Sequence, residues 1–279
     1  MRFELTSAEG LPIRGTFDVP TDPRALVVIV HGFKGFMDWG FFPFLAETLC
    51  NDGFAVCRFN MSRSGIGANL ETFDRLDLFE GDTYSKQLAD LRRVVAWAHE
   101  QFAFLPIFLF GHSRGGGIAF LGAHDVPHLR GIVTWSAIAR ADRWDEGTKK
   151  EWRAGGYLEV INARTKQTMR LSAEILDDYE RNRESLDITR AVSRLRCPML
   201  LLHGGADESV PIADLHEIAS CAPSASTIVI ARASHTYNAI HPLIHVPFAL
   251  SMAATLTSRF IAAYTETRTI VGTSVSQQT

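Results

Sequence analysis

The stretch Ile107-Phe-Leu-Phe-Gly-His-Ser-Arg-Gly-Gly-Gly-Ile-Ala119 decides the fold of this chain. Its first four residues are apolar at every position, as in a strand that is buried on both faces of a parallel sheet. Residues 111–115 fit the pattern G-x-S-x-G, in which a sharp turn from strand to helix exposes the central hydroxyl. The small residues that follow suit a closely packed helix. The sequence therefore predicts a strand, a strained turn at Ser113 and a helix that starts beside a developing negative charge.

Strand-like and helix-like segments alternate on both sides of this stretch, with a polar loop at residues 61–82. By apolar patterning, strands are expected over residues 2–7, 11–19, 25–30, 55–59, 106–110, 131–135, 199–203 and 227–230. Helices are expected over residues 41–51, 84–99, 115–123, 212–220 and 247–264. An opening hairpin followed by this alternation predicts an α/β fold with a doubly wound, mostly parallel sheet.

Length and composition exclude several classes of protein. The chain has 279 residues, of which 46% are hydrophobic and 21% are charged, with a formal net charge of −3. This length allows one or two domains with a large core. The charge balance favours neither nucleic acid nor an anionic membrane as a partner. The four cysteines are scattered without a C-x-x-C pair, which argues against a disulfide scaffold and a structural zinc site.

The amino-terminal stretch is not expected to act as a targeting segment. An acid, Glu4, precedes any apolar run, so no signal peptide is expected. The run at residues 25–30 is far shorter than the roughly 20 residues that span a bilayer, so a cytoplasmic protein is expected. Residues 266–279 have little to bury and are expected to form a frayed tail. One catalytic domain over residues 1–265 is the expected organisation.

Residues 137–186 interrupt the alternation. This segment is highly charged but also contains large aromatic residues, and a hairpin is expected within it over residues 157–161 and 168–171. We expect an insertion that covers one end of the sheet as a lid, because unusually long connections in compact domains are often functional. The alternative is an exposed helical excursion.

Two further residues complete a pattern with Ser113. A serine hydroxyl is a weak nucleophile until a base takes its proton, and a carboxylate commonly orients that base. Asp207 lies in the loop after the strand at residues 199–203, and His235 lies in the loop after residues 227–230. All three residues follow the carboxyl ends of expected parallel strands, where open α/β sheets place their sites.

The sequence leaves competitors for the acid. Glu208 and Asp214 are close to Asp207, and Asp142 or Asp145 would serve if the acid followed the preceding strand. Among the ten histidines, His203 ends an apolar strand and is expected to be a core or turn residue.

These motifs resemble the serine α/β-hydrolase superfamily, in particular small bacterial esterases and dienelactone-hydrolase-like or acyl-peptidase-like enzymes. The similarity extends over residues 25–264 and includes residues 31–33, the turn at Ser113, and residues 203–207 and 233–235. It implies Ser113 as nucleophile, His235 as general base and acid, and Asp207 as the residue that orients the imidazole.

The same resemblance implies an oxyanion hole formed by the backbone N–H groups of Phe33 and Arg114. His31 is expected to be a structural hydrogen-bonding residue beneath that loop. Residues 60–65 depart from the Gly-x-Gly turn that relatives often carry, so the shape of this loop is open. The aromatic residues expected to line a substrate pocket, although such clusters also form cores, are Phe36, Trp39, Trp144 and Trp152.

The expected reaction is hydrolysis of a small-molecule carboxylic ester, aryl or short-to-medium acyl, through an acyl-enzyme. No metal or organic cofactor is expected. The alternatives are a peptidase or amidase of the acyl-peptide type, a thioesterase or acyltransferase, and a non-catalytic protein that binds a small molecule on the same scaffold. The sequence does not distinguish a monomer from a homodimer.

Overall fold

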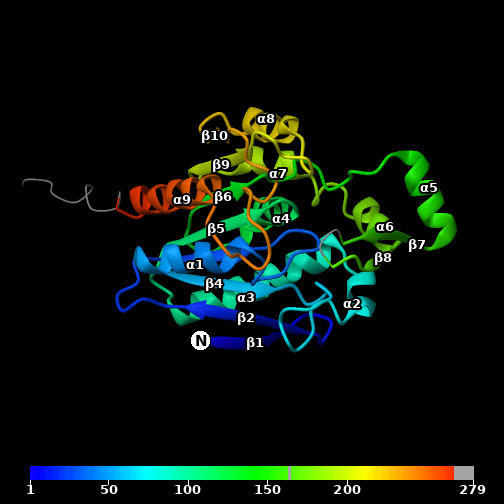
Figure 1. Ribbon diagram of the computed structural model, residues 1–279, viewed down its shortest axis with the longest axis horizontal. Coiled ribbons are helices and arrows are strands. Elements are labelled where there is room, and N and C mark those ends of the chain that lie inside the picture. Colours follow the sequence, from blue (N-terminus) through cyan, green and yellow to red (C-terminus); the bar gives the residue numbers. More distant parts are fainter. Residues whose placement is uncertain (163–164, 267–279) are drawn as a thin grey trace, which may run out of the picture.

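A mostly parallel sheet of eight strands forms the centre of the molecule (Figure 1). The computed structural model describes residues 1–162 and 165–266. The strands, in the spatial order β1-β2-β4-β3-β5-β6-β9-β10, are β1 (Arg2–Thr6), β2 (Pro12–Asp18), β4 (Phe54–Asn60), β3 (Ala25–Val30), β5 (Ile107–His112), β6 (Leu129–Trp135), β9 (Met199–Gly204) and β10 (Ser226–Ile230). Strand β2 pairs antiparallel with β1 and β4, and the pairs from β4 to β10 are parallel. The predicted fold class is confirmed.

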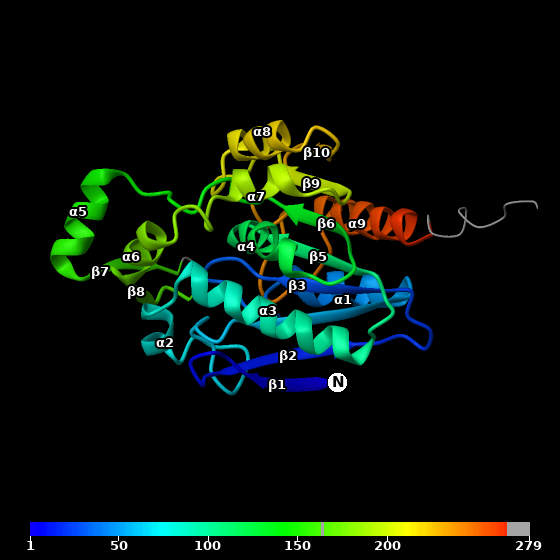
Figure 2. The same ribbon diagram turned by 180° about the vertical axis from the view of Figure 1, so that it is seen from behind.

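Helices cover both faces of this sheet. On one face, α1 (Phe41–Asn51) packs against α9 (Phe248–Glu266). On the other face, neighbouring helices form a row, as seen by comparing Figures 1 and 2: α3 (Tyr84–Gln101), α4 (Arg114–Gly122), α7 (Ile188–Arg194) and α8 (Ile212–Cys221). The central strands β3, β5 and β9 are buried at every residue, because helices exclude water from both of their faces.

Residues 137–186 form a separate group of elements at one end of the long axis of the molecule (Figures 1 and 2). They comprise α5 (Glu146–Gly155), β7 (Tyr157–Ile161), β8 (Thr168–Ser172) and α6 (Glu174–Arg181). Strands β7 and β8 pair antiparallel, which confirms the predicted hairpin strands; residues 163–164 of its turn lie outside the described part. Strand β8 also contacts α2 (Leu76–Glu80), a short helix within the segment expected to be a polar loop.

The tail expected at residues 266–279 lies almost wholly outside the described residues. The last helix, α9, ends at Glu266, and residues 267–279 of the expected tail lie outside the described residues. Across residues 1–162 and 165–266, no helix has both the length and the apolar character needed to cross a membrane.

Candidate active site

Ser113 lies at the sharp turn between β5 and α4. Its backbone has φ 57° and ψ −123°, a left-handed conformation that is strained for a residue with a side chain. A Cβ atom on Gly111 would lie 2.4 Å from the carbonyl oxygen of Gly115, and a Cβ atom on Gly115 would lie 2.3 Å from that of Val30. Only glycine fits at these two positions. The G-x-S-x-G spacing is therefore required by the close approach of helix to strand.

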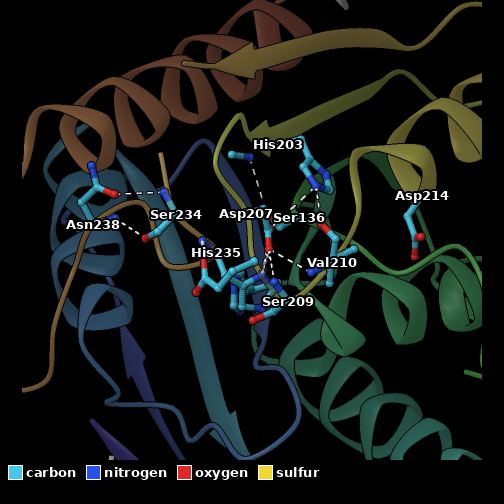
Figure 3. A network of polar contacts seen from close by, with 12 residues as sticks. Ser136, His203, Asp207, Ser209, Val210, Asp214, Ser234, His235 and Asn238 are labelled. Carbon is cyan, nitrogen blue, oxygen red and sulfur yellow. Dashed lines mark hydrogen bonds and ion pairs between the residues drawn. The ribbon is translucent and has the colours of Figure 1, made fainter. Parts of the chain in front are cut away.

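His235 and Asp207 are hydrogen-bonded to each other in the loops after β10 and β9 (Figure 3). The distances from His235 Nδ1 to Asp207 Oδ2 and Oδ1 are 2.9 and 3.0 Å. Since a carboxylate can only accept, Nδ1 carries the proton and donates it. The lone pair of the neutral ring is then on Nε2, where a general base needs it.

Asp207 lies in a pocket that favours its ionised form. Its side chain is 1% exposed, and its Oδ1 accepts hydrogen bonds of 2.9 Å from the backbone N–H groups of Ser209 and Val210. Burial alone would raise the pKa of Asp207, but the hydrogen bond and charge of His235, with the Val210 N–H, hold it well below its usual range. A buried carboxylate thus orients the imidazole.

The neighbouring carboxylates have other partners. Glu208 accepts a hydrogen bond of 3.3 Å from the backbone N–H of His235, rather than from its ring. Asp214 pairs with Arg143 at 2.7 Å and lies apart from the Asp207 network in Figure 3.

The two carboxylates after β6 are also engaged elsewhere. Asp142 pairs with Lys149 at 2.5 Å, and Asp145 caps α5 by accepting a hydrogen bond from the Thr148 N–H. Of the candidate acids, Asp207 is the one that the structure places on the His235 ring.

A cavity of about 720 Å³ is lined by both Ser113 and His235. Among the described residues, no hydrogen bond joins the Ser113 hydroxyl to His235, and such contacts often tighten only when a substrate binds. The other lining residues are Gly32, Phe33, Lys34, Gly35, Trp39, Phe42, His112, Arg114, Ile138, Arg143, Trp144, Asn162, Glu208, Ser209, Val210, Thr236, Ala239, Ile240 and His241. The part of the chain described here contains no group of three or more His, Cys, Asp or Glu side chains suited to a metal ion.

Phe33 and Arg114 line the same cavity as Ser113. Within residues 1–162 and 165–266, neither backbone N–H group donates to a protein acceptor. Both donors are thus available to a ligand at the start of α4, where the helix dipole favours negative charge.

His31 supports the loop that carries Phe33. Its Nδ1 donates to the carbonyl oxygen of Gly32 at 2.9 Å, and its Nε2 accepts from the Met61 N–H at 3.2 Å. Burial lowers the pKa of His31 to about 4, so the ring is neutral near pH 7. These contacts agree with the structural role expected for this residue.

Acidification from pH 7 to pH 5 is expected to cost about 2 kcal/mol of unfolding free energy through His31. Its pKa is about 4 in the folded protein and 6.5 ordinarily, so the unfolded chain binds the extra proton first. The stability is present above pH 6.5 and is lost as the pH falls toward 4. Urea unfolding at both pH values should show a smaller difference for His31→Gln than for the wild type. An equal difference in the two proteins would contradict this role.

The aromatic residues expected in the pocket divide into two pairs. Trp39 and Trp144 line the cavity, whereas Phe36 and Trp152 do not. Phe36 is buried and packs edge-on against His241. Trp152 is 1% exposed, and its indole N–H donates to the Leu171 carbonyl within the insertion. Both of these side chains belong to the hydrophobic core.

Several cavity residues were not anticipated from the sequence. Ile240 and His241 come from the loop after His235, and Asn162 comes from the end of β7. His241 also accepts a hydrogen bond from the Gly40 N–H at 2.9 Å, which ties its loop to the start of α1. The closeness of residues 240–241 to His235 in sequence is the one signal that could have pointed to them.

The strand order and the positions of Ser113, Asp207 and His235 after β5, β9 and β10 define this chain as an α/β-hydrolase. The chain belongs to the serine aminopeptidase S33 family, whose model matches residues 21–187, more than half of the sequence. The resemblance found in the sequence motifs is confirmed.

Curated relatives match a limited part of the chain. It is 30% identical over 123 residues to a monoglyceride lipase homolog of monkeypox virus, a match that covers 44% of this chain and 41% of the relative. It is 31% identical over 127 residues to a putative phosphoribosyl transferase of Mycobacterium tuberculosis, which covers 44% of this chain and 27% of the relative. The chain thus spans less than half of the length of either relative.

Solved structures match nearly the whole chain. The ferulic acid complex of Est1E from Butyrivibrio proteoclasticus has a TM-score of 0.72 and 21% identity, and the match covers 94% of this chain and 98% of that one. Dienelactone hydrolase from Anabaena variabilis has a TM-score of 0.62 and 18% identity, with 95% and 98% covered. At these identities, the similarity establishes the shared fold.

Proposed function

We propose that this protein hydrolyses carboxylic esters through an acyl-enzyme formed on Ser113. The observation that carries the proposal is the hydrogen bond from His235 Nδ1 to the buried, ionised Asp207, with His235 and Ser113 in the wall of the same cavity. This arrangement leaves His235 Nε2 to act as a base toward the serine hydroxyl.

In the acylation step, Ser113 Oγ attacks the ester carbonyl carbon while His235 Nε2 takes the hydroxyl proton. The carbonyl oxygen becomes an oxyanion, which the N–H groups of Phe33 and Arg114 stabilise. Each such donor typically contributes a factor of about 10² to 10³ in kcat. The imidazolium, stabilised by Asp207, then protonates the alkoxide as the bond to the leaving alcohol breaks.

Deacylation repeats these steps with water as the nucleophile. His235 removes a proton from the water as its oxygen attacks the acyl carbon. Collapse of the second tetrahedral intermediate breaks the bond to Ser113 Oγ, which recovers its proton from the imidazolium. The products are a carboxylic acid and an alcohol.

Aromatic side chains in the cavity lining favour an apolar or aryl ester. Trp39 precedes α1, whereas Trp144 and Ile138 belong to the insertion at residues 137–186. We propose that this insertion caps the substrate site and that its Trp144 packs on the substrate. The ferulic acid bound to Est1E and the name of the viral lipase homolog are compatible with such substrates.

Trp144→Ala is expected to raise KM for an aryl ester about 3- to 10-fold, because an aromatic contact is worth roughly 0.5–1.5 kcal/mol. KM for a methyl ester of the same acid should change less. Initial-rate kinetics with both esters measure this. Tyr157→Ala is the control, since Tyr157 is an aromatic residue of the insertion that does not line the cavity. Equal effects of the two substitutions would argue against contact between Trp144 and the substrate.

An aminopeptidase is the second candidate, favoured by the name of the family and by one carboxylate. Glu208 lines the cavity and could bind a substrate ammonium group. Comparison of p-nitrophenyl esters, graded by acyl length, with aminoacyl p-nitroanilides distinguishes the two activities. Ester hydrolysis with kcat/KM at least tenfold higher is the expected result. A preference for the anilides, lost in Glu208→Gln, would replace the esterase proposal by the aminopeptidase.

A further inference from the structure

The two residues proposed to form the oxyanion hole touch each other through their side chains. The guanidinium carbon of Arg114 lies 4.0 Å from the centre of the Phe33 ring. The Tyr84 ring lies 4.9 Å from the same carbon, and the Phe33 ring stacks on Phe79 with centroids 5.4 Å apart. A chain of ring contacts therefore joins the loop after β3 to the start of α4, and this chain passes through the Arg114 guanidinium.

Asp82 holds this guanidinium from the turn before α3. Its Oδ2 lies 3.6 Å from Arg114 Nη1, and the two side chains are 4% and 6% exposed. Arg114 Nη1 makes no hydrogen bond within the described residues, so the rings and the carboxylate determine where the guanidinium lies. Gln87 Nε2 in turn donates to Asp82 Oδ2 at 2.5 Å.

The charges of this pair depend on each other. Burial raises the pKa of Asp82 to about 7, and the positive charge of Arg114 opposes that rise. A buried guanidinium without a carboxylate would be strongly unfavourable. The ionised carboxylate, which predominates above about pH 7, therefore fixes both side chains in one place.

We infer that Asp82, the Arg114 side chain and the Phe33 ring form a clamp that sets the spacing of the two backbone N–H donors. The inference rests on the proposed function and assigns these side chains as positioning groups. Donors stabilise an oxyanion well only at about 2.7–3.1 Å, so a small shift of the Phe33 loop relative to α4 would weaken both contacts together. The geometry of the oxyanion hole would then depend on the packing of these side chains as well as on the backbone.

The test compares three substitutions that disrupt the clamp at different points. Arg114→Met keeps length but removes the charge, Asp82→Asn removes the carboxylate charge, and Phe33→Leu removes the ring. Each is expected to lower kcat for a p-nitrophenyl ester by about 10- to 100-fold, with KM changed by less than about 3-fold. Affinity for an alkyl trifluoromethyl ketone, whose adduct with Ser113 carries an oxyanion, should fall by a similar factor.

A spectroscopic readout separates positioning from general loss of structure. Weaker donors leave the acyl carbonyl of the trapped acyl-enzyme less polarised, so its infrared stretch should move to higher wavenumber in all three variants. Phe33→Tyr keeps the aromatic ring that Phe33→Leu removes. Its kcat and the infrared stretch of its acyl carbonyl should therefore be close to the wild-type values. Asp90→Asn is the matched control: Asp90 is a carboxylate of α3, 2% exposed and bonded to the Ser62 N–H at 2.7 Å.

The outcomes distinguish this inference from the proposed function. A wild-type protein that neither hydrolyses esters nor forms the ketone adduct would refute the proposed function. The clamp would be overturned if the wild type is active and the folded Asp82→Asn and Phe33→Leu variants behave like it. In that case kcat and ketone affinity would stay within twofold of the wild type, and the carbonyl stretch would not shift. Circular dichroism and thermal melting establish folding, and these two variants decide the matter if Arg114→Met does not fold.

Discussion

Ser113→Ala is expected to lower kcat for p-nitrophenyl ester hydrolysis by about 10⁴-fold or more. The reason is that the alanine side chain cannot form the acyl-enzyme, so only the N–H donors and substrate binding remain to accelerate attack by water. Initial rates above the uncatalysed background, with circular dichroism as the check on folding, provide the measurement.

The control for this substitution is Ser64→Ala. Ser64 is buried, and its hydroxyl accepts a hydrogen bond from the Ile66 N–H, but it does not line the cavity. Its replacement should leave kcat within a few-fold of the wild type. If Ser113→Ala retained more than about a tenth of the wild-type rate, the hydrolysis would proceed without an acyl-enzyme on this residue.

Asp207→Asn is expected to reduce kcat by about 10⁴-fold, as in other enzymes where an amide replaces the acid of this constellation. The asparagine amide can donate to His235 Nδ1, which would place the ring proton on Nε2 and remove the lone pair that the proposed general base needs. It also removes the charge that stabilises the imidazolium. The effect should appear in kcat, with little change in KM, for a p-nitrophenyl ester.

Two neighbouring carboxylates provide the comparison for Asp207. Asp142 pairs with Lys149, and Asp145 caps α5, so neither contacts His235. Asp142→Asn and Asp145→Asn should each change kcat by less than about 5-fold. If either variant lost most of its kcat while Asp207→Asn stayed active, the catalytic acid would have to be assigned to the loop after β6.

The central strands of the sheet could be predicted closely from the sequence because they are apolar at nearly every position. The expected strand at residues 25–30 matches β3, and the expected helix at residues 41–51 matches α1. The elements that were missed are short helices: α2 within the expected polar loop, α5 and α6 in the insertion, and α7 after it. A short helix such as α5 is marginally stable on its own and is held by the packing of its one buried residue, Trp152. Because its other side chains are mostly polar or charged, its apolar pattern is too weak to predict a helix.

The candidate site could likewise be predicted only in part from the sequence. Ser113, Asp207 and His235 could be located because each follows a recognisable strand, and the parallel sheet brings those strand ends to one edge. The residues that line the cavity could not be predicted, because the same aromatic residue types occur in hydrophobic cores and in substrate pockets. Phe36 and Trp39 are three residues apart, yet only Trp39 reaches the cavity. The contact between Arg114 and Phe33 likewise depends on distances that no sequence pattern encodes.

Labelling with a fluorophosphonate tests the central claim most directly, because the reagent reacts with a serine that a neighbouring base activates. The intact mass of the folded protein should rise by one phosphonyl group, and peptide mapping should place that group on Ser113. Ser113→Ala, equally folded, should remain unlabelled. A folded wild-type protein that gains no mass, or that carries the label on another residue while Ser113→Ala is still labelled, would contradict the account.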